Sequence, residues 1–382
     1  MKTCKPMLLT AMTLFAALAI TVQASAQSHV IAFDAAAKAK ITTFDAPGAG
    51  KGAGQGTVPY GINPPGAIAG ADIDAGRVFH GFLRAAGGKI TKFDAPGAGK
   101  RSGYGTAAYG INPAGAITGY DVDVNSLFNG YLRAKDGKVT TFQAPGAGTG
   151  FLQGTFAASI NATGTIAGYL LDANNVHHGY VRAPDATFTT FDAPGAGTGS
   201  GQGTFTDFFS GINPAGTITG FYLDASNVYH SYVRAPDGTI TTFDVSGAGT
   251  GKSQGTQVAS INRVGAVTGE YIDASNVYHG FLRASDGTIT KFNVAGAGTG
   301  SGQGTVPQNI NPAGAITGFY LDASNVYHGF LRTKGGSTTF DVPGAGTGQF
   351  QGTIPTANDP AGAITGYYID AGGAYHGFLR TP

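Results

Sequence analysis

The sequence contains no tryptophan, one cysteine and few charged residues. Charged residues make up 12% of the chain, and only one of the 22 acidic residues, Glu270, is a glutamate. Because helix surfaces usually draw on Glu, Lys, Gln and Leu, this scarcity argues against a helical fold. The single cysteine, Cys4, precedes an apolar stretch near the N-terminus, so the rest of the chain has no disulfide and no thiol chemistry.

The chain is instead rich in glycine, with 64 residues, and has an aromatic fraction of 11%. Thr, Ile, Val, Phe and Tyr recur between Gly, Pro, Asn and Asp, which is typical of short strands separated by turns. The glycines show no Gly-X-Y period, which excludes a collagen-like chain. The apolar residues suffice for a core, so the composition predicts a folded all-β protein.

The N-terminus has the features of a signal peptide, predicted over residues 1–26. Lys2 and Lys5 precede the apolar stretch Met7–Val22, and Ala24-Ser25-Ala26 forms a small-residue cleavage site. An uncleaved anchor is the alternative, although this stretch is short for a membrane span. Cleavage removes two of the 23 basic residues and none of the 22 acidic ones, which leaves a net charge of −1. This balance gives no electrostatic case for nucleic acid, and no membrane insertion is expected after cleavage.

Seven similar units follow one another from residue 41 onward. Consecutive units begin 49 residues apart, except that the fourth unit is three residues longer. Such self-similarity indicates repeated structural modules that share one domain. Residues 27–40 are interpreted as an N-terminal extension or a partial repeat. The predicted units of the single domain 41–382 are 41–89, 90–138, 139–187, 188–239, 240–288, 289–337 and 338–382.

Each unit is predicted to contain four strands. Ile41–Asp45 exemplifies the first, and a glycine-rich link separates it from the second, which ends at Ile-Asn. Asn213-Pro214-Ala215-Gly216 then has Asn, Pro and Gly where a type I turn favours them. The third strand is expected over Thr217–Leu223 and the fourth over Val228–Val233. The short connections predict antiparallel pairing within each unit.

Closure into a ring explains how such units bury their faces. A four-stranded sheet cannot bury both faces alone, and radial closure hides most strand edges. The last unit ends after a fourth strand, so it lacks an outermost strand unless Ile41–Asp45 supplies one. The sequence therefore predicts a seven-bladed β-propeller of four-stranded antiparallel blades, closed by the N-terminal strand, which completes the last blade. We expect it to be a monomer.

The repeated motif also carries a family resemblance. Ile-Asn, Pro-x-Gly and Ile-Thr-Gly, followed by the triplet seen at His279-Gly280-Phe281, resemble the HAF family of bacterial extracellular repeats, named for His-Ala-Phe. Asn129, Tyr180 and Ser231 depart from the triplet. The resemblance covers residues 41–382 and implies a bacterial protein, secreted to the extracellular space or periplasm, with a propeller-like fold. The family brings no established activity, so no functional residue is carried over.

Aspartates end the third strand of every unit, and Asp72 and Asp121 add a second carboxylate in the first two units. Calcium needs several oxygens that converge on one loop, and these loops lack a bidentate Glu. The favoured interpretation is that Asp and Asn cap the turns through backbone bonds. No cofactor is predicted, with calcium in the first two units as the alternative. The aspartates are Asp74, Asp123, Asp172, Asp224, Asp273, Asp322 and Asp370.

Histidine and arginine each occupy one position of the fourth strand. A ring of histidines binds metal only around a narrow axis, so we expect a buried His that bonds a carbonyl or an Asp and locks adjacent sheets. The arginines are expected to pair or stack in every blade. The residues are His80, His178, His230, His279, His328 and His376, and Arg84, Arg133, Arg182, Arg234, Arg283, Arg332 and Arg380.

The sequence contains no catalytic motif. The glycine-rich links lack the Gly-Lys-Ser/Thr and the following helix of a phosphate loop. His-Glu-x-x-His does not occur, and the one match to Gly-x-Ser-x-Gly, Gly251-Lys252-Ser253-Gln254-Gly255, lies in a glycine-rich link with no helix expected after it. Glu270 stands out from the repeat and is interpreted as an exposed substitution on an outward-facing position.

The start of the second strand, expected nearest the axis, differs between units, and the fourth unit carries its three extra residues there. Exposed aromatic rings at an axial mouth would suit a sugar or a peptide, and the alternative is that they fill the tunnel. This mouth is expected on the face shared by the glycine-rich links and the Asp turns. The predicted ligand-binding residues are Tyr60, Tyr109, Phe156, Phe205, Asp207, Phe208, Phe209, Gln257 and Gln308.

The sequence thus favours a secreted or cell-surface, non-catalytic binding module for a glycan or a surface protein. One alternative is a polysaccharide hydrolase or lyase with an active site in the axial mouth. The other is a purely structural surface protein.

Overall fold

The computed structural model describes residues 39–206 and 210–382. The predicted signal peptide, residues 27–38 of the extension, and Asp207, Phe208 and Phe209 lie outside the described residues. The regular structure of the described residues consists of 28 β-strands without any helix. No segment of this part of the chain is therefore an apolar helix that could cross a membrane.

The strands pair in antiparallel sets of four, which we call quartets and number along the chain. In quartet 1 the inner strand β2 (Gly56–Ile62) is followed outward by β3 (Ile68–Ile73), β4 (Phe79–Arg84) and β5 (Ile90–Phe93). Quartet 2 contains β6 (Gly105–Ile111), β7 (Ile117–Val122), β8 (Phe128–Arg133) and β9 (Val139–Phe142). Quartet 3 contains β10 (Gly154–Ile160), β11 (Ile166–Leu171), β12 (His177–Arg182) and β13 (Phe188–Phe191).

The next three quartets repeat this order. Quartet 4 contains β14 (Gly203–Thr206), β15 (Ile218–Leu223), β16 (Tyr229–Arg234) and β17 (Ile240–Phe243). Quartet 5 contains β18 (Gly255–Ile261), β19 (Val267–Ile272), β20 (Tyr278–Arg283) and β21 (Ile289–Phe292). Quartet 6 contains β22 (Gly304–Ile310), β23 (Ile316–Leu321), β24 (Tyr327–Thr333) and β25 (Gly336–Phe340).

Quartet 7 joins the two ends of the described chain. Its first three strands are β26 (Gly352–Asn358), β27 (Ile364–Ile369) and β28 (Tyr375–Thr381). Its outer strand is β1 (Lys40–Phe44), which pairs with β28 along its whole length, from Lys40 opposite Thr381 to Phe44 opposite Gly377. This is the strand exchange that the sequence predicted.

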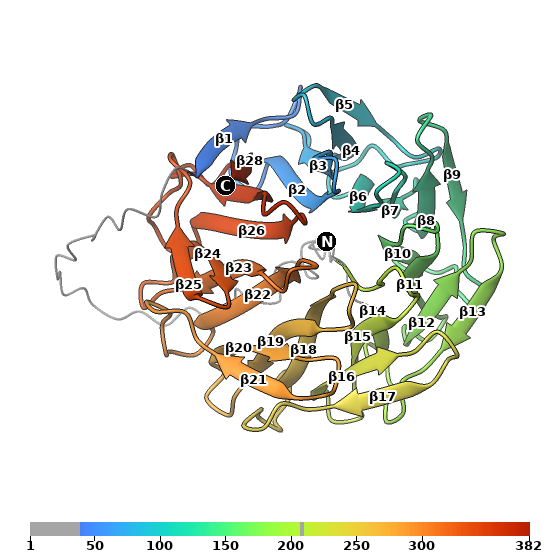
Figure 1. The fold of residues 1–382 in the computed structure, drawn as a ribbon. Helices are drawn as coiled ribbons and strands as arrows, with labels where there is room; N and C mark the ends of the chain where they lie inside the picture. The colour runs from blue at the N-terminus through green and yellow to red at the C-terminus, as the bar shows by residue number, and fades with distance from the viewer. Residues whose placement is uncertain (1–38, 207–209) are drawn as a thin grey trace, which may run out of the picture.

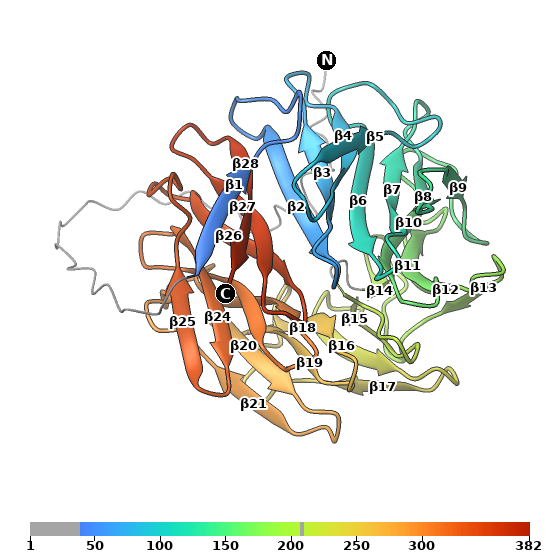
Figure 2. The same cartoon turned by 45° about the horizontal axis from the view of Figure 1, so that its top comes forward.

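The quartets follow one another around a closed ring (Figure 1). The inner strands lie around the centre, and neighbours such as β2 and β6, β6 and β10, and β26 and β2 contact one another. The tilted view shows the strands of each quartet stepping outward from these inner strands (Figure 2). The described chain is thus a closed all-β ring, an arrangement consistent with a β-propeller.

A ladder of asparagine side chains links one quartet to the next. Asn213 Oδ1 accepts the backbone N–H groups of Ala215 and Thr217, which fixes the turn expected from the sequence. Its Nδ2 donates to the carbonyl of Asn262 in the next quartet. The same side-chain bond to the following quartet, at 3.0 to 3.4 Å, is made by Asn63, Asn112, Asn161, Asn213, Asn262 and Asn311. The seventh position holds Asp359, whose carboxylate has no N–H to donate.

The triplet His-Gly-Phe has a packing role. The Phe and Tyr residues at its third position, such as Phe82 and Tyr131, are completely buried between quartets. Its glycine lies under the aromatic ring of the outer strand: a Cβ at Gly130 would meet the ring of Phe142 at 2.5 Å. Close approach therefore favours glycine at this position, although quartet 4 accommodates a buried serine, Ser231, there.

Candidate functional site

The arginine column joins neighbouring quartets by stacking, which is one of the two roles, pairing or stacking, that the sequence predicted. In every quartet the guanidinium carbon lies 4.4 to 5.0 Å from the ring centroid of a Phe on the outer strand of the preceding quartet. Arg84 closes the circle by covering Phe44 of β1. This geometry gives the arginines a structural role in each contact between quartets.

Each histidine of the column lies between two polar groups of its own quartet. In quartet 1, His80 Nδ1 lies 2.9 Å from Asp94 Oδ1, and Nε2 lies 3.5 Å from Asp74 Oδ2. The expected bond to Asp is confirmed, but the expectation that His locks adjacent sheets is wrong. Both aspartates belong to the same quartet as their histidine, because Asp94 follows the outer strand β5 and Asp74 follows β3. The imidazoles are also only partly buried, with 20 to 29% of each side chain exposed.

Quartet 2 has other residues at the positions of the histidine and of the aspartate that follows the outer strand. Asn129 stands in place of His, and its Nδ2 donates to Asp121 Oδ2 at 3.2 Å. Gln143 stands in place of the outer-strand Asp and donates to Asn129 Oδ1 at 2.7 Å. In the described ranges, no group of three or more His, Cys, Asp or Glu is placed to hold a metal ion.

The residues predicted for the axial mouth do not share one exposed surface. Tyr60, Tyr109 and Phe156 are only 2, 6 and 7% exposed and belong to one buried cluster near the axis. Tyr60 and Tyr109 stack with their ring centroids 4.4 Å apart. This burial agrees with the alternative that aromatic rings fill the space near the axis. Phe205, Gln257 and Gln308 are half-buried, whereas Asp207, Phe208 and Phe209 lie outside the described residues.

Glu270 is buried, so its interpretation as an exposed, outward-facing residue is wrong. It lies on β19 opposite Gln257 of β18, and its side chain is 7% exposed. Its position faces the axial cluster, as the buried Tyr120 and Tyr169 do at the same position in other quartets. Burial raises the pKa of the neighbouring Tyr278, and the charge of Glu270 raises it further.

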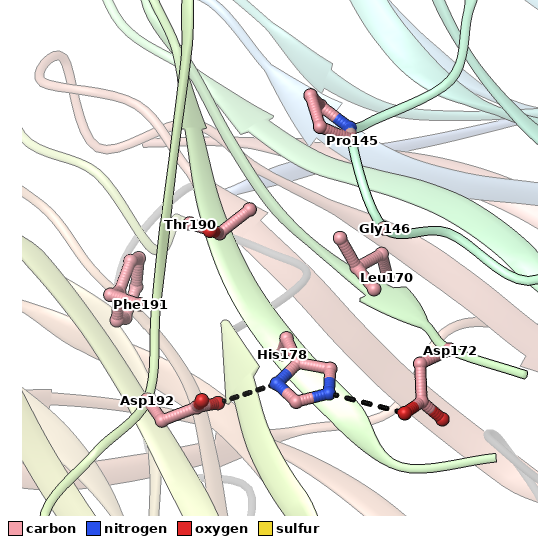
Figure 3. Close-up of a pocket in the computed structure, with 8 residues that line it drawn as sticks. All are labelled: Pro145, Gly146, Leu170, Asp172, His178, Thr190, Phe191 and Asp192. Atoms are coloured by element: carbon pink, nitrogen blue, oxygen red, sulfur yellow. Dashed lines mark hydrogen bonds and ion pairs between the residues drawn. The ribbon is translucent and has the colours of Figure 1, made fainter. Parts of the chain in front are cut away.

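A pocket of about 510 Å³ lies in quartet 3, beside the link that enters it from β9 (Figure 3). The link contacts the end of β11 through a bond from Gly148 N–H to Leu171 O of 2.7 Å. The pocket is therefore on the face that carries the glycine-rich links and the Asp turns. The sequence placed its ligand on this face but at the axial mouth, and none of the residues predicted there lines the pocket. The pocket is lined by Pro145, Gly146, Leu170, Asp172, His178, Thr190, Phe191 and Asp192.

The pocket lies where Leu170 is smaller than its counterparts in quartets 4 to 7. In quartets 4 to 7 this position holds a tyrosine, whose ring stacks on the histidine of the column with centroids 4.7 to 5.0 Å apart. In quartet 4 a Cβ on the link glycine Gly195 would lie 3.3 Å from the Tyr222 hydroxyl. At the equivalent Gly146 a Cβ would meet nothing within 4 Å. The space that the Tyr222 ring occupies in quartet 4 is therefore open at the equivalent place in quartet 3.

The polar groups of the pocket converge on His178 (Figure 3). Its Nδ1 lies 2.9 Å from Asp192 Oδ1, and its Nε2 lies 3.6 Å from Asp172 Oδ2. Only the imidazolium form donates from both ring nitrogens. Burial acts to raise the pKa of Asp172, but bonds from the Val176 and Asn174 N–H groups and the nearby His178 outweigh it and hold the pKa below its usual value.

The lining thus combines apolar walls with a few convergent polar groups, which is typical of ligand pockets. Leu170 and Pro145 supply apolar surface, and the Thr190 hydroxyl and the half-exposed Asp192 carboxylate supply hydrogen-bonding groups. The sequence contains a signal for this site that the sequence analysis missed. Leu170 is the one apolar residue in a column otherwise made of Asp and Tyr.

No protein-family model matches the chain, so its resemblance to the HAF family stays a prediction. No curated protein matches it either. Among solved structures, it is similar to one from a study of two prolyl endopeptidases, at 11% identity and a TM-score of 0.50, over 87% of this chain and 47% of that one. The chain thus spans about half of that protein, and at this identity the likeness shows the fold alone.

Two further solved structures have lower scores. AofleA from Arthrobotrys oligospora has a TM-score of 0.47 and 12% identity, over 80% of this chain and 90% of that one. A lectin mutant from Aleuria aurantia in complex with alpha-methyl-L-fucoside has a TM-score of 0.41 and 13% identity, over 78% of this chain and 96% of that one.

Proposed function

We propose that the protein is an exported, non-catalytic binding module that takes a glycan or a surface protein at the pocket of quartet 3. In this proposal the seven quartets are the blades of a seven-bladed β-propeller, and residues 1–26 direct export. The ring is the frame, and the pocket is one of the places where a quartet differs from the others.

The observation that carries the proposal is the open space left by Leu170 beside His178 and Asp192. Glycans and peptides both offer groups that the Asp192 carboxylate and the Thr190 hydroxyl can bond, and both offer apolar surface for Leu170. No observation favours the hydrolase or lyase alternative, since Glu270 is buried and Asp207 lies outside the described residues.

The test is binding of the purified protein to a glycan array and to a peptide array. Leu170→Tyr returns the ring that quartets 4 to 7 possess, so it should fill the pocket and weaken binding at least 100-fold. Val264→Tyr adds the same ring at an exposed turn at the opposite ends of the strands and should leave binding unchanged. Binding that survives Leu170→Tyr would place the ligand elsewhere, and a wild-type protein that binds neither array would contradict the function.

A further inference from the structure

The pocket of quartet 3 lies where quartets 4 to 7 hold a tyrosine side chain. Tyr222 shows how that side chain lies in quartet 4: its ring stacks on His230 with centroids 5.0 Å apart and planes inclined by 21°. The same stack recurs with Tyr271, Tyr320 and Tyr368, at interplanar angles of 21 to 23°. The fold therefore builds this slot repeatedly and fills it from within the chain in four quartets.

The groups that surround a tyrosine in quartet 4 are all present in quartet 3. His178 lies opposite Leu170 as His230 lies opposite Tyr222. His178 is held by Asp192, and His230 is held by Asp244 in the same way. Quartet 3 lacks only the tyrosine ring, because the Leu170 side chain is too short to reach the link.

Quartet 3 also contains a hydrogen-bond partner for the hydroxyl of a tyrosine ring in this slot. The Thr242 side chain lies close enough to the Tyr222 phenol to lower its pKa against the effect of burial, and Thr339 does the same for Tyr320. Thr190 occupies the position of Thr242, since it lies opposite Tyr180 as Thr242 lies opposite Tyr232. Thr190 lines the pocket, so its hydroxyl is placed to bond a phenol there.

The recurring stack favours an aromatic ring as the ligand. In quartets 4 to 7 the group that lies on the histidine of the column is a tyrosine ring, with centroids 4.7 to 5.0 Å apart. His178 is held at the same position in quartet 3 by Asp192. Aromatic rings stack in this way on one another, so the slot favours a phenol.

Exposed apolar side chains on the link that lines the pocket, and on the turn bonded to this link, point to a polypeptide ligand. Phe151 is 62% exposed and lies on the same link as Pro145 and Gly146. The link is fixed to the adjacent turn by a bond from Leu152 N–H to Ser126 O, and that turn carries Val124, which is 65% exposed. With Val264, these are the large hydrophobic residues that the described chain leaves most open to solvent. Exposed apolar groups beside a pocket are typical of protein interaction sites.

We propose that the pocket of quartet 3 binds a tyrosyl side chain of a polypeptide partner, stacked on His178 with its hydroxyl on Thr190. This inference rests on the proposed function and chooses between the two ligand classes left open there. The partner's tyrosine takes the place that the chain's own tyrosines take in quartets 4 to 7.

The test is calorimetric titration of the purified full-length protein with N-acetyl-L-tyrosinamide and p-cresol, which both carry the phenol, and with methyl pyranosides. We expect one site for the two phenols. Thr190→Val should weaken phenol binding about 10-fold through the lost hydrogen bond, and Leu170→Tyr should abolish it. Tyr222→Leu opens the equivalent slot in quartet 4 and should raise the number of p-cresol sites from one to two.

The outcomes separate this inference from the proposed function. Binding of a pyranoside but not of the phenols, with loss in Leu170→Tyr, would overturn the tyrosyl ligand and keep the binding function. Phenol binding that Leu170→Tyr and Thr190→Val both leave intact would overturn the inference. If no phenol, no pyranoside and no array ligand binds, both proposals fail.

Discussion

The guanidinium carbon of Arg84 lies 4.8 Å from the ring centroid of Phe44, and this contact joins the first quartet to a strand from the start of the chain. Phe44 also packs edge-on against Phe82, with centroids 6.4 Å apart. The contact between quartets 7 and 1 therefore depends on β1, which supplies both the ring on which Arg84 stacks and part of the core around Phe82.

Phe44→Ala should destabilise the ring at this contact. The change removes the surface under Arg84 and a partner of Phe82, and we expect a loss of about 2 kcal/mol from the free energy of unfolding. Urea unfolding followed by circular dichroism measures it. Lys40→Ala on the same strand changes an exposed side chain and serves as the control. Equal effects of the two changes would refute a specific role for the ring.

Gly130→Ala should be costly, because the new methyl group would meet the ring of Phe142 at 2.5 Å. Overpacking of this kind costs about 1 to 3 kcal/mol. Gly87→Ala is the matched control, since a Cβ there would meet nothing within 4 Å. Thermal unfolding of the two variants should show a lowered midpoint for Gly130→Ala alone, and similar midpoints would contradict the packing argument.

Asp359→Asn should stabilise the ring. The new amide supplies a donor toward the Asn63 carbonyl, as in the six other quartets, a bond worth about 1 kcal/mol. Burial raises the pKa of Asp359 although three backbone N–H bonds lower it, so the wild type loses stability as pH rises above about 4. The advantage of the variant should therefore be larger at pH 8 than at pH 4 in urea unfolding. Asp237→Asn, at an exposed turn, should show no such gain.

Asp121 should make stability depend on pH in the neutral range. Its side chain is completely buried, and burial raises its pKa to about 7, with a smaller effect from Asp123. The protonated form is favoured in the fold, so stability is full below about pH 4 and falls as pH rises to about 7. The loss should be of the order of a few kcal/mol and absent in Asp121→Asn, as measured by unfolding across pH 4 to 8.

A second variant tests the same carboxylate by adding a cation. In quartet 1 the equivalent Asp72 has Lys92 Nζ at 2.8 Å from its Oδ2. Thr141 occupies the position of Lys92 in quartet 2, since both lie opposite the aromatic residue of the triplet. Thr141→Lys should therefore stabilise the protein at pH 8 and flatten its pH dependence. A variant as pH-sensitive as the wild type would contradict the assignment to Asp121.

The sequence predicted those features that repeat in every unit. Strands, turns and the arginine column follow from patterns present seven times, so an error in one copy does not change the prediction. The exchange of β1 follows from the same repeat, because the last unit lacks the outer strand that the others have. Arg84 and Arg380 could be assigned a stacking role from their column alone. The partner of each arginine could not, because it belongs to the preceding quartet and depends on how quartets pack.

The candidate site was harder to predict, because it depends on Leu170 lacking the aromatic ring that tyrosine has at the same position. Leu170 looks unremarkable until the tyrosines at its position are known to cover the histidines. The aromatic residues Tyr60 and Tyr109 were expected at an open mouth, since sequence shows that they vary but not that they stack on each other. The burial of Glu270 was missed for the same reason, because the direction of its side chain depends on the strand register.

The pairing of β1 with β28 brings together Lys40 and Thr381, which are 341 residues apart in the chain. Contacts over such a separation carry a large entropy cost and form late in folding. β1 has no other pairing partner, so both of its edges stay open to pairing with other chains until β28 is in place. Closure of quartet 7 is therefore the step that protects this strand from aggregation.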